Sequence, residues 1–159
     1  MSKKNSNKKE VKRKKETKAK HNFSKQGKKN RSAGRRFELK VRKDLELKGY
    51  IVDKWTNTVE FTNGKGRIIP AKRKYNPFLR ALSIGTGFPD FIALKIPKKG
   101  RKEIIGIEVK KNGYLTKEEK DKCRFYLQLG LFSKILIAKA VKNGRSINIE
   151  YIDFKKKYE

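Results

Sequence analysis

Two segments of the chain show the periodicity of an amphipathic helix. In the first, Phe37, Val41 and Leu45 recur every four residues and a glycine follows, which predicts a helix over 33–48. The second segment opens with a Thr-x-x-Glu pattern, the spacing of a capping box, and closes before another glycine. This pattern predicts a helix over 117–129.

Short apolar or alternating runs separate these helices and predict strands. Asn63-Gly64 and Asn143-Gly144 mark tight turns, and Lys98-Lys99-Gly100 marks a short connection after Pro97. The stretch 70–87 is basic and is predicted to be rich in loops. The predicted strands are 50–55, the hairpin 58–69, 88–96, 103–111, 134–140 and 147–154. This order predicts an α/β fold, with one mixed sheet flanked by helices and with hairpins in place of uniform strand–helix–strand units.

Positive charge is unevenly distributed along the chain. The 159 residues include 45 Lys and Arg against 16 Asp and Glu, and 16 of the basic residues lie within 1–36. The first 32 residues have only scattered apolar side chains, so burial cannot offset the entropy lost on ordering them. We therefore expect a disordered basic tail over 1–32 and a single folded domain over 33–159. Nucleic acid is the partner that this charge favours, although a basic tail can also serve solubility or localisation alone.

Composition also excludes several kinds of site and indicates the cellular location. Cys123 is the single cysteine and His21 the single histidine, which excludes a disulfide framework and histidine-rich zinc sites. No apolar run approaches the roughly twenty residues that span a bilayer, and no secretory signal opens the chain. We expect a cytoplasmic protein without membrane partners, in a nucleoid-associated or viral replication context.

One Glu-x-Lys triplet differs from the others in its setting. The pattern occurs six times, but only Glu108-Val109-Lys110 lies within a predicted strand, after an apolar run. Residues two apart on a strand share a face, so Glu108 and Lys110 project together while Val109 occupies the opposite face. On a central strand two such charges would be buried, which is costly unless they are paired or bind a ligand. On an edge strand they would be exposed to water. The sequence leaves both placements open.

Asp90 is expected to lie close to this pair. It opens a predicted strand, and antiparallel pairing of 90–96 with 103–110 would bring it beside Glu108. Two carboxylates on a basic surface form a hard-oxygen site suited to Mg²⁺ or Mn²⁺.

Glu38 is a further candidate on the first predicted helix. At about 100° per residue, its side chain borders the buried stripe formed by Phe37, Val41 and Leu45. It either takes part in the metal site or forms a boundary ion pair with Arg42.

Three motifs in this chain resemble those of a known family. They are Gly34-Arg35-Arg36-Phe37-Glu38, Gly87-Phe88-Pro89-Asp90 and Ile107-Glu108-Val109-Lys110, the last followed by a predicted helix. In order and spacing the set resembles the PD-(D/E)XK nuclease superfamily, and within it the archaeal Holliday-junction resolvases and the viral-type replication-repair nucleases. The segment 113–119 is similar to the one that follows the catalytic strand in the latter group.

This resemblance implies a restriction-endonuclease-like core and a Mg²⁺-dependent (or Mn²⁺-dependent) DNA endonuclease of recombination or repair. The enzyme would act on branched DNA as a homodimer. Asp90, Glu108 and the Val109 carbonyl would hold the metal ion, with support from Glu38, while Lys110 would act on the attacking water. The residues expected to contact the DNA backbone are Arg35, Arg36, Arg67, Lys72, Arg73, Lys74, Lys111 and Lys117.

Two features depart from the family pattern. Glu119 or Lys120 occupies the region where the family commonly has a Gln, and 56–84 is longer than a minimal resolvase needs. Two alternatives stay open beside the junction-cutting enzyme. One is a nuclease that acts on linear duplex, flap or single-stranded DNA, and the other is a non-catalytic basic nucleic-acid-binding protein.

Overall fold

The computed structural model describes residues 3–77, 80–83, 87–96 and 102–159, and their side chains from Lys25 onward except those of Lys74 and Ser83. The chain divides into two compact units, Met1–Arg36 and Phe37–Glu159. The connection predicted at 98–100, with the preceding proline, lies outside the described residues, as do the first two residues of the predicted tail.

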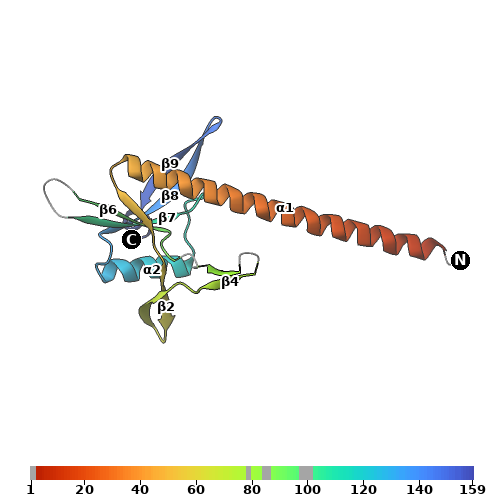
Figure 1. Ribbon diagram of the computed structural model, residues 1–159, viewed down its shortest axis with the longest axis horizontal. Coiled ribbons are helices and arrows are strands. Elements are labelled where there is room, and N and C mark those ends of the chain that lie inside the picture. The colour runs from red at the N-terminus through yellow and green to blue at the C-terminus, as the bar shows by residue number, and fades with distance from the viewer. Residues whose placement is uncertain (1–2, 78–79, 84–86, 97–101) are drawn as a thin grey trace. The chain divides into compact units, whose positions relative to one another are not determined.

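The first unit is helical where the sequence predicts disorder. Helix α1 spans Lys3–Leu47, so it includes most of the helix predicted over 33–48 and continues through the basic segment (Figure 1). The predicted end is confirmed, with Gly49 in the left-handed region at φ 81°. The expectation of disorder considered only how little apolar surface this segment can bury. Local propensity favours the helix, because Lys, Arg, Glu and Gln are good helix formers and no proline interrupts the segment.

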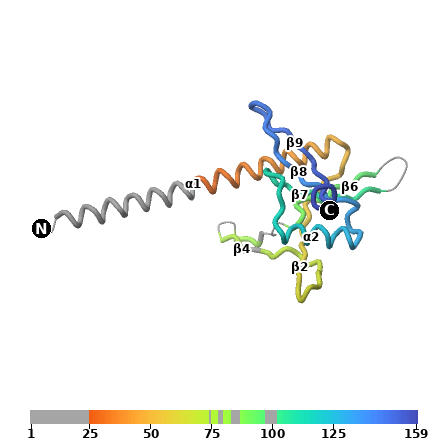
Figure 2. Tube along the Cα trace, turned by 180° about the vertical axis from the view of Figure 1, so that it is seen from behind, coloured from red at the N-terminus to blue at the C-terminus, as the bar shows by residue number. Residues whose placement is uncertain are grey.

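Among the described residues, five strands of the second unit form one mixed sheet. They are β1 (Ile51–Lys54), β6 (Phe91–Lys95), β7 (Glu103–Val109), β8 (Lys134–Asn143) and β9 (Ser146–Asp153). The sheet order is β1-β6-β7-β8-β9, in which β7 and β8 are parallel and the other pairs antiparallel. Helix α2 (Lys117–Gln128) connects β7 to β8 (Figures 1 and 2). The predicted α/β class with a mixed sheet is confirmed, and β7 is the central strand.

The sheet buries apolar side chains on both faces. On one face, Phe37, Val41 and Leu45 of α1 pack with Ile105 and Ile107 of β7. The opposite face packs against α2 and the segment after it, through a cluster that includes Cys123, Tyr126, Phe132, Ile135 and Ile137. Because side chains alternate along β7, the side chain of Glu108 faces α2, opposite to those of Ile105 and Ile107. The charged residues of the predicted motif therefore lie on the α2 side.

Two further hairpins lie within the part of the chain that the structure describes. β2 (Asn57–Thr62) and β3 (Lys65–Pro70) form the hairpin predicted around Asn63-Gly64. This hairpin packs on α2 through Phe61 and Phe125, whose ring centroids lie 6.0 Å apart. β4 (Lys74–Asn76) and β5 (Ala81–Ser83) form a short second hairpin where the sequence predicts loops.

The end of the chain also differs slightly from the prediction. The last strand ends at Asp153 instead of Phe154, and a short helix, α3 (Phe154–Tyr158), follows it. The Asp153 side chain accepts hydrogen bonds from the N–H groups of Lys155 and Lys156, so it caps this helix. None of the helices in the described ranges is both long and apolar enough to cross a membrane.

Candidate metal centre

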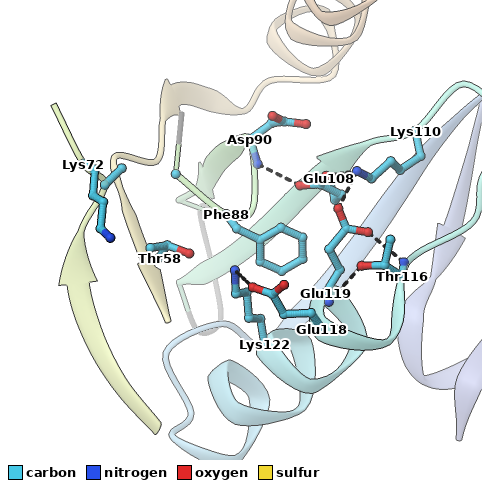
Figure 3. Close-up of a pocket in the computed structure, with 12 residues that line it drawn as sticks. Thr58, Lys72, Phe88, Asp90, Glu108, Lys110, Thr116, Glu118, Glu119 and Lys122 are labelled. Carbon is cyan, nitrogen blue, oxygen red and sulfur yellow. Dashed lines mark hydrogen bonds and ion pairs between the residues drawn. The ribbon is translucent and has the colours of Figure 1, made fainter. Parts of the chain in front are cut away.

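Asp90 and Glu108 lie side by side at the ends of two neighbouring strands. In the antiparallel register of β6 and β7, Phe91 pairs with Ile107, which places the preceding Asp90 opposite Glu108. The backbone N–H of Asp90 donates to Oε2 of Glu108 at 3.2 Å (Figure 3). The backbone N–H of Val109 donates to Oδ2 of Asp90 at 2.8 Å. The predicted proximity of the two carboxylates is confirmed. The assignment of the Val109 carbonyl to a metal ion stays a prediction.

Backbone contacts fix the segment that leads into Asp90. The N–H of Phe88 donates to the carbonyl of Asn57 at 2.9 Å, and that of Trp55 donates to the carbonyl of Asp90 at 3.2 Å. Only glycine fits before Phe88, because a Cβ on Gly87 would lie 2.2 Å from the carbonyl oxygen of Trp55. The glycine of this motif therefore allows close packing against the connection between β1 and β2.

Lys110 is held by two carboxylates. Its Nζ lies 3.1 Å from Oε1 of Glu108 and 2.6 Å from Oε1 of Glu119. Oε2 of Glu119 also accepts the N–H of Thr116 at 2.8 Å, which completes the predicted capping box of α2. Glu119 thus fixes the ammonium group and the start of the helix together. The sequence predicts its capping role, but its contact with Lys110 depends on how α2 packs against the sheet.

Burial makes both central carboxylates hard to ionise. Desolvation, followed by the charge of Asp90, raises the pKa of Glu108 to about 8. Desolvation also raises the pKa of Asp90 to about 6; the hydrogen bond from Val109 acts against this rise and the charge of Glu38 adds to it. A divalent cation would supply the missing counter-charge, and carboxylate oxygens are the donors that Mg²⁺ and Mn²⁺ prefer. The two residues therefore fit the expected metal ion.

Lys110 stays cationic between its partners. Burial acts to lower its pKa, but the hydrogen bond to Glu119 and the charge of Glu108 outweigh burial and raise the pKa above its ordinary value. Burial likewise acts to raise the pKa of Glu119, but hydrogen bonds from Lys110 and Thr116 outweigh it and lower that pKa. In this arrangement Lys110 can orient a water molecule or stabilise negative charge.

Glu38 lies near the carboxylate pair without completing a set of three ligands. Its charge contributes to the raised pKa of Asp90. Within the described residues, no group of three His, Cys, Asp or Glu side chains is arranged to hold a metal ion. Arg42, the alternative partner of Glu38, bonds instead to Oε1 of Glu46 at 2.9 Å and to the carbonyl of Val52 at 3.1 Å. Support of a metal ion by Glu38, directly or through water, stays a prediction.

A cavity of about 380 Å³ opens at the carboxylate pair. Figure 3 shows Thr58 and Lys72 on one side of it and the residues of α2 on the other. Its lining consists of Thr58, Ala71, Lys72, Gly87, Phe88, Asp90, Glu108, Lys110, Thr116, Glu118, Glu119 and Lys122. Lys122 was not among the site residues predicted from the sequence. The chain has 45 Lys and Arg residues, and only the fold shows that this one lines the cavity.

The residues expected to contact DNA are spread over both units. Lys72 is the member of this set that lines the cavity among the described side chains. The backbone of Lys74 lies in β4, and its side chain is outside the described part of the structure. The others are exposed: Arg35 and Arg36 in the first unit, and Arg67, Arg73, Lys111 and Lys117 in the second.

Comparison of this chain with models of protein families, with curated proteins and with solved structures finds no match. Only the chemistry of the site and the motifs that form it indicate a function.

Proposed function

We propose that this protein is a metal-dependent DNA endonuclease. The observation that carries the proposal is the convergence of Asp90, Glu108 and Lys110 on one cavity in a chain of net charge +29. Two buried neighbouring carboxylates suit a divalent cation, and an excess of Lys and Arg suits a polyphosphate partner. Hydrolysis of a phosphodiester bond uses both.

Each residue of the site has a distinct part in this chemistry. A bound Mg²⁺ or Mn²⁺ supplies charge stabilisation to the phosphate and makes a water molecule more nucleophilic. Asp90 and Glu108 would hold the ion, and the N–H of Val109 orients the Asp90 carboxylate. Lys110, fixed between Glu108 and Glu119, orients the attacking water and stabilises the negative charge that develops on the phosphate. Glu38 would support the ion directly or through water, and the carbonyl of Val109 would help to hold it.

The resemblance of the three motifs to the PD-(D/E)XK superfamily supports a narrower proposal. In this proposal the sheet around β6 and β7 is a restriction-endonuclease-like core. The likeness to archaeal resolvases favours branched DNA as the substrate and a homodimer as the active form, because symmetric cutting of two strands needs two sites. Such an enzyme acts in recombination or repair, in the cytoplasm or during viral replication.

A cleavage panel tests the proposal. Junction, flap, linear duplex and single-stranded DNA are incubated with the protein and Mg²⁺, with EDTA as the control. We expect Mg²⁺-dependent cleavage with a preference for the junction, and none in EDTA. Preference for another substrate would support the proposed endonuclease activity but contradict branched DNA as its substrate. Binding of every substrate without cleavage, under Mg²⁺ or Mn²⁺, would support the non-catalytic nucleic-acid-binding protein instead.

A further inference from the structure

Lys122 is almost buried at the cavity that contains the carboxylate pair. Its side chain is 14% exposed, and its Nζ lies 5.9 Å from the centre of the Phe88 ring. Its counter-ion is Glu118, one turn earlier on α2, at 2.7 Å from Nζ. That carboxylate is itself 72% exposed, so water screens it strongly and the pair contributes little. A lysine held this far from water by a weak partner is available to a stronger anion.

Lys72 lies on the other side of the same cavity. It follows the β2–β3 hairpin, it is exposed, and it forms no ion pair with any other described residue. Thr58 of β2 lies beside it in the lining and offers a hydroxyl group (Figure 3). Two cations from separate elements thus line the same cavity as the carboxylate pair.

Lys110 cannot serve as the main anion-binding group of this cavity. Two carboxylates, Glu108 and Glu119, already neutralise its single charge at 3.1 Å and 2.6 Å. A phosphate that approaches the carboxylate pair therefore needs cationic contacts in addition to Lys110. Lys122 and Lys72 are the cavity lysines that remain among the described side chains.

The charge balance of the cavity agrees with this division. Its described lining carries four carboxylates and three ammonium groups. One divalent cation at Asp90 and Glu108 turns this small negative balance into a positive one. A bound divalent cation therefore favours the binding of an anionic phosphate in the cavity.

We propose that Lys122 and Lys72 form a phosphate-binding subsite that holds a backbone phosphodiester of the DNA strand beside the carboxylate pair. This inference rests on the proposed function, since it takes DNA to be the ligand of the cavity. Glu118 acts as an exchangeable counter-ion: it pairs with Lys122 in the free protein and turns to solvent when the phosphate arrives.

Equilibrium binding tests the subsite without any cleavage. Affinity for a short labelled DNA strand and for its duplex is measured against salt concentration, with Ca²⁺ in place of Mg²⁺. We compare the full-length protein with Lys122→Gln, Lys72→Gln and Glu118→Gln. The matched control is Lys120→Gln, because Lys120 lies on the same helix but contacts the Tyr158 ring at 4.3 Å instead of lining the cavity.

The subsite predicts opposite effects from the two members of the ion pair. Lys122→Gln should reduce the salt slope by about one and weaken binding by about tenfold, because one phosphate contact is lost. Lys72→Gln should act in the same direction. Glu118→Gln should strengthen binding, since it removes the competing anion and leaves Lys122 in place. Lys120→Gln should change the slope less than Lys122→Gln.

A neutral-phosphate scan identifies the contact itself. Methylphosphonate linkages replace the phosphates of the strand one at a time, and we expect one position to weaken binding by the wild type but not by Lys122→Gln. Equal loss in both proteins at every position, or an unchanged salt slope in Lys122→Gln, would overturn the subsite even if the protein cleaves DNA. A positive result here, combined with no cleavage of any substrate in the Mg²⁺ and Mn²⁺ panel, would keep the subsite and refute the endonuclease. If Lys122→Gln fails to fold, unchanged binding by Glu118→Gln overturns the subsite.

Discussion

The backbone N–H of Val109 and the carboxylate of Asp90 are joined by a hydrogen bond of 2.8 Å. This bond connects the central strand β7 to the residue that precedes β6, so the main chain itself orients the carboxylate. The same strand carries Glu108, and Lys110 follows directly after its end. Because one central strand positions all of these groups, their mutual geometry depends on the strand register more than on flexible side-chain contacts.

Two substitutions of Glu119 should separate its role in the capping box from its ion pair with Lys110. Glu119→Gln retains a side chain that can accept the Thr116 N–H in the capping box but removes the charge that faces Lys110. We expect an unchanged melting temperature and a cleavage rate reduced by about tenfold, as for other groups that orient a metal-site residue. Glu119→Ala should show the same loss of rate and also lose about 1 kcal/mol of stability. Equal melting temperatures for the two variants would contradict the capping role.

Glu38→Gln tests the support that Glu38 is proposed to give from α1. Gln is nearly isosteric with Glu and the position is half-buried, so stability should change little. Loss of the charge should lower Mg²⁺ affinity and the cleavage rate by about tenfold. Isothermal titration with Mg²⁺ and single-turnover cleavage measure the two effects, and a normal value of both would remove Glu38 from the site.

The contact between α1 and β9 predicts a dependence of stability on acid pH. Asp44 Oδ2 accepts hydrogen bonds from Lys48 Nζ and from the Tyr151 hydroxyl, each at 2.7 Å. Burial acts to raise the pKa of Asp44, but these bonds outweigh it and hold the pKa below the ordinary value of 3.8. A lowered folded-state pKa gives stability that is complete above 3.8 and is lost as the pH falls through the folded value.

Asp44→Asn should therefore be less stable than the wild type at neutral pH, and the difference should shrink below the ordinary pKa of Asp44. Chemical denaturation at a series of pH values measures this difference. A difference that stays constant across the acid range would show that the carboxylate charge does not stabilise the contact.

Deletion of residues 1–32 tests the basic segment separately from the site. It removes most of the Lys and Arg of the first unit but keeps Phe37, Val41 and Leu45, which pack on the sheet. We expect weaker binding to every DNA and a flatter salt dependence, because fewer counterions are released. The single-turnover rate at saturating enzyme should stay unchanged. A collapsed rate would place the segment in the active site, and an unchanged salt slope would show that it does not touch DNA.

Local patterns in the sequence predicted the parts of the site that depend on strand register. The alternation of residues around Glu108 and Lys110 predicted that both side chains lie on one face of the strand. The short link between two apolar strands predicted that Asp90 lies close to Glu108. The Thr116–Glu119 spacing gave the capping box. In each case the evidence lies within a few residues of the chain or in one simple pairing.

What the sequence did not predict depends on packing between distant segments. The position of Lys122 at the cavity follows from how α2 packs against the sheet and against the β2–β3 hairpin, and no local pattern marks it. The short β4 and β5 strands lack alternation. The extension of α1 through the basic segment follows from local helix propensity, which the prediction of a disordered tail did not consider.

Single-turnover cleavage by the wild type and Asp90→Asn, at saturating enzyme, decides whether Asp90 belongs to a catalytic metal site. The Asn side chain keeps an oxygen that can accept the Val109 N–H, so the substitution removes the charge and preserves the local geometry. We predict a cleavage rate lower by about a hundredfold or more, with DNA affinity within a few-fold of the wild type. Stabilisation by Mg²⁺ against thermal unfolding should also disappear. Near-normal cleavage by Asp90→Asn would contradict the assignment of this carboxylate to the metal ion, and with it the proposed mechanism.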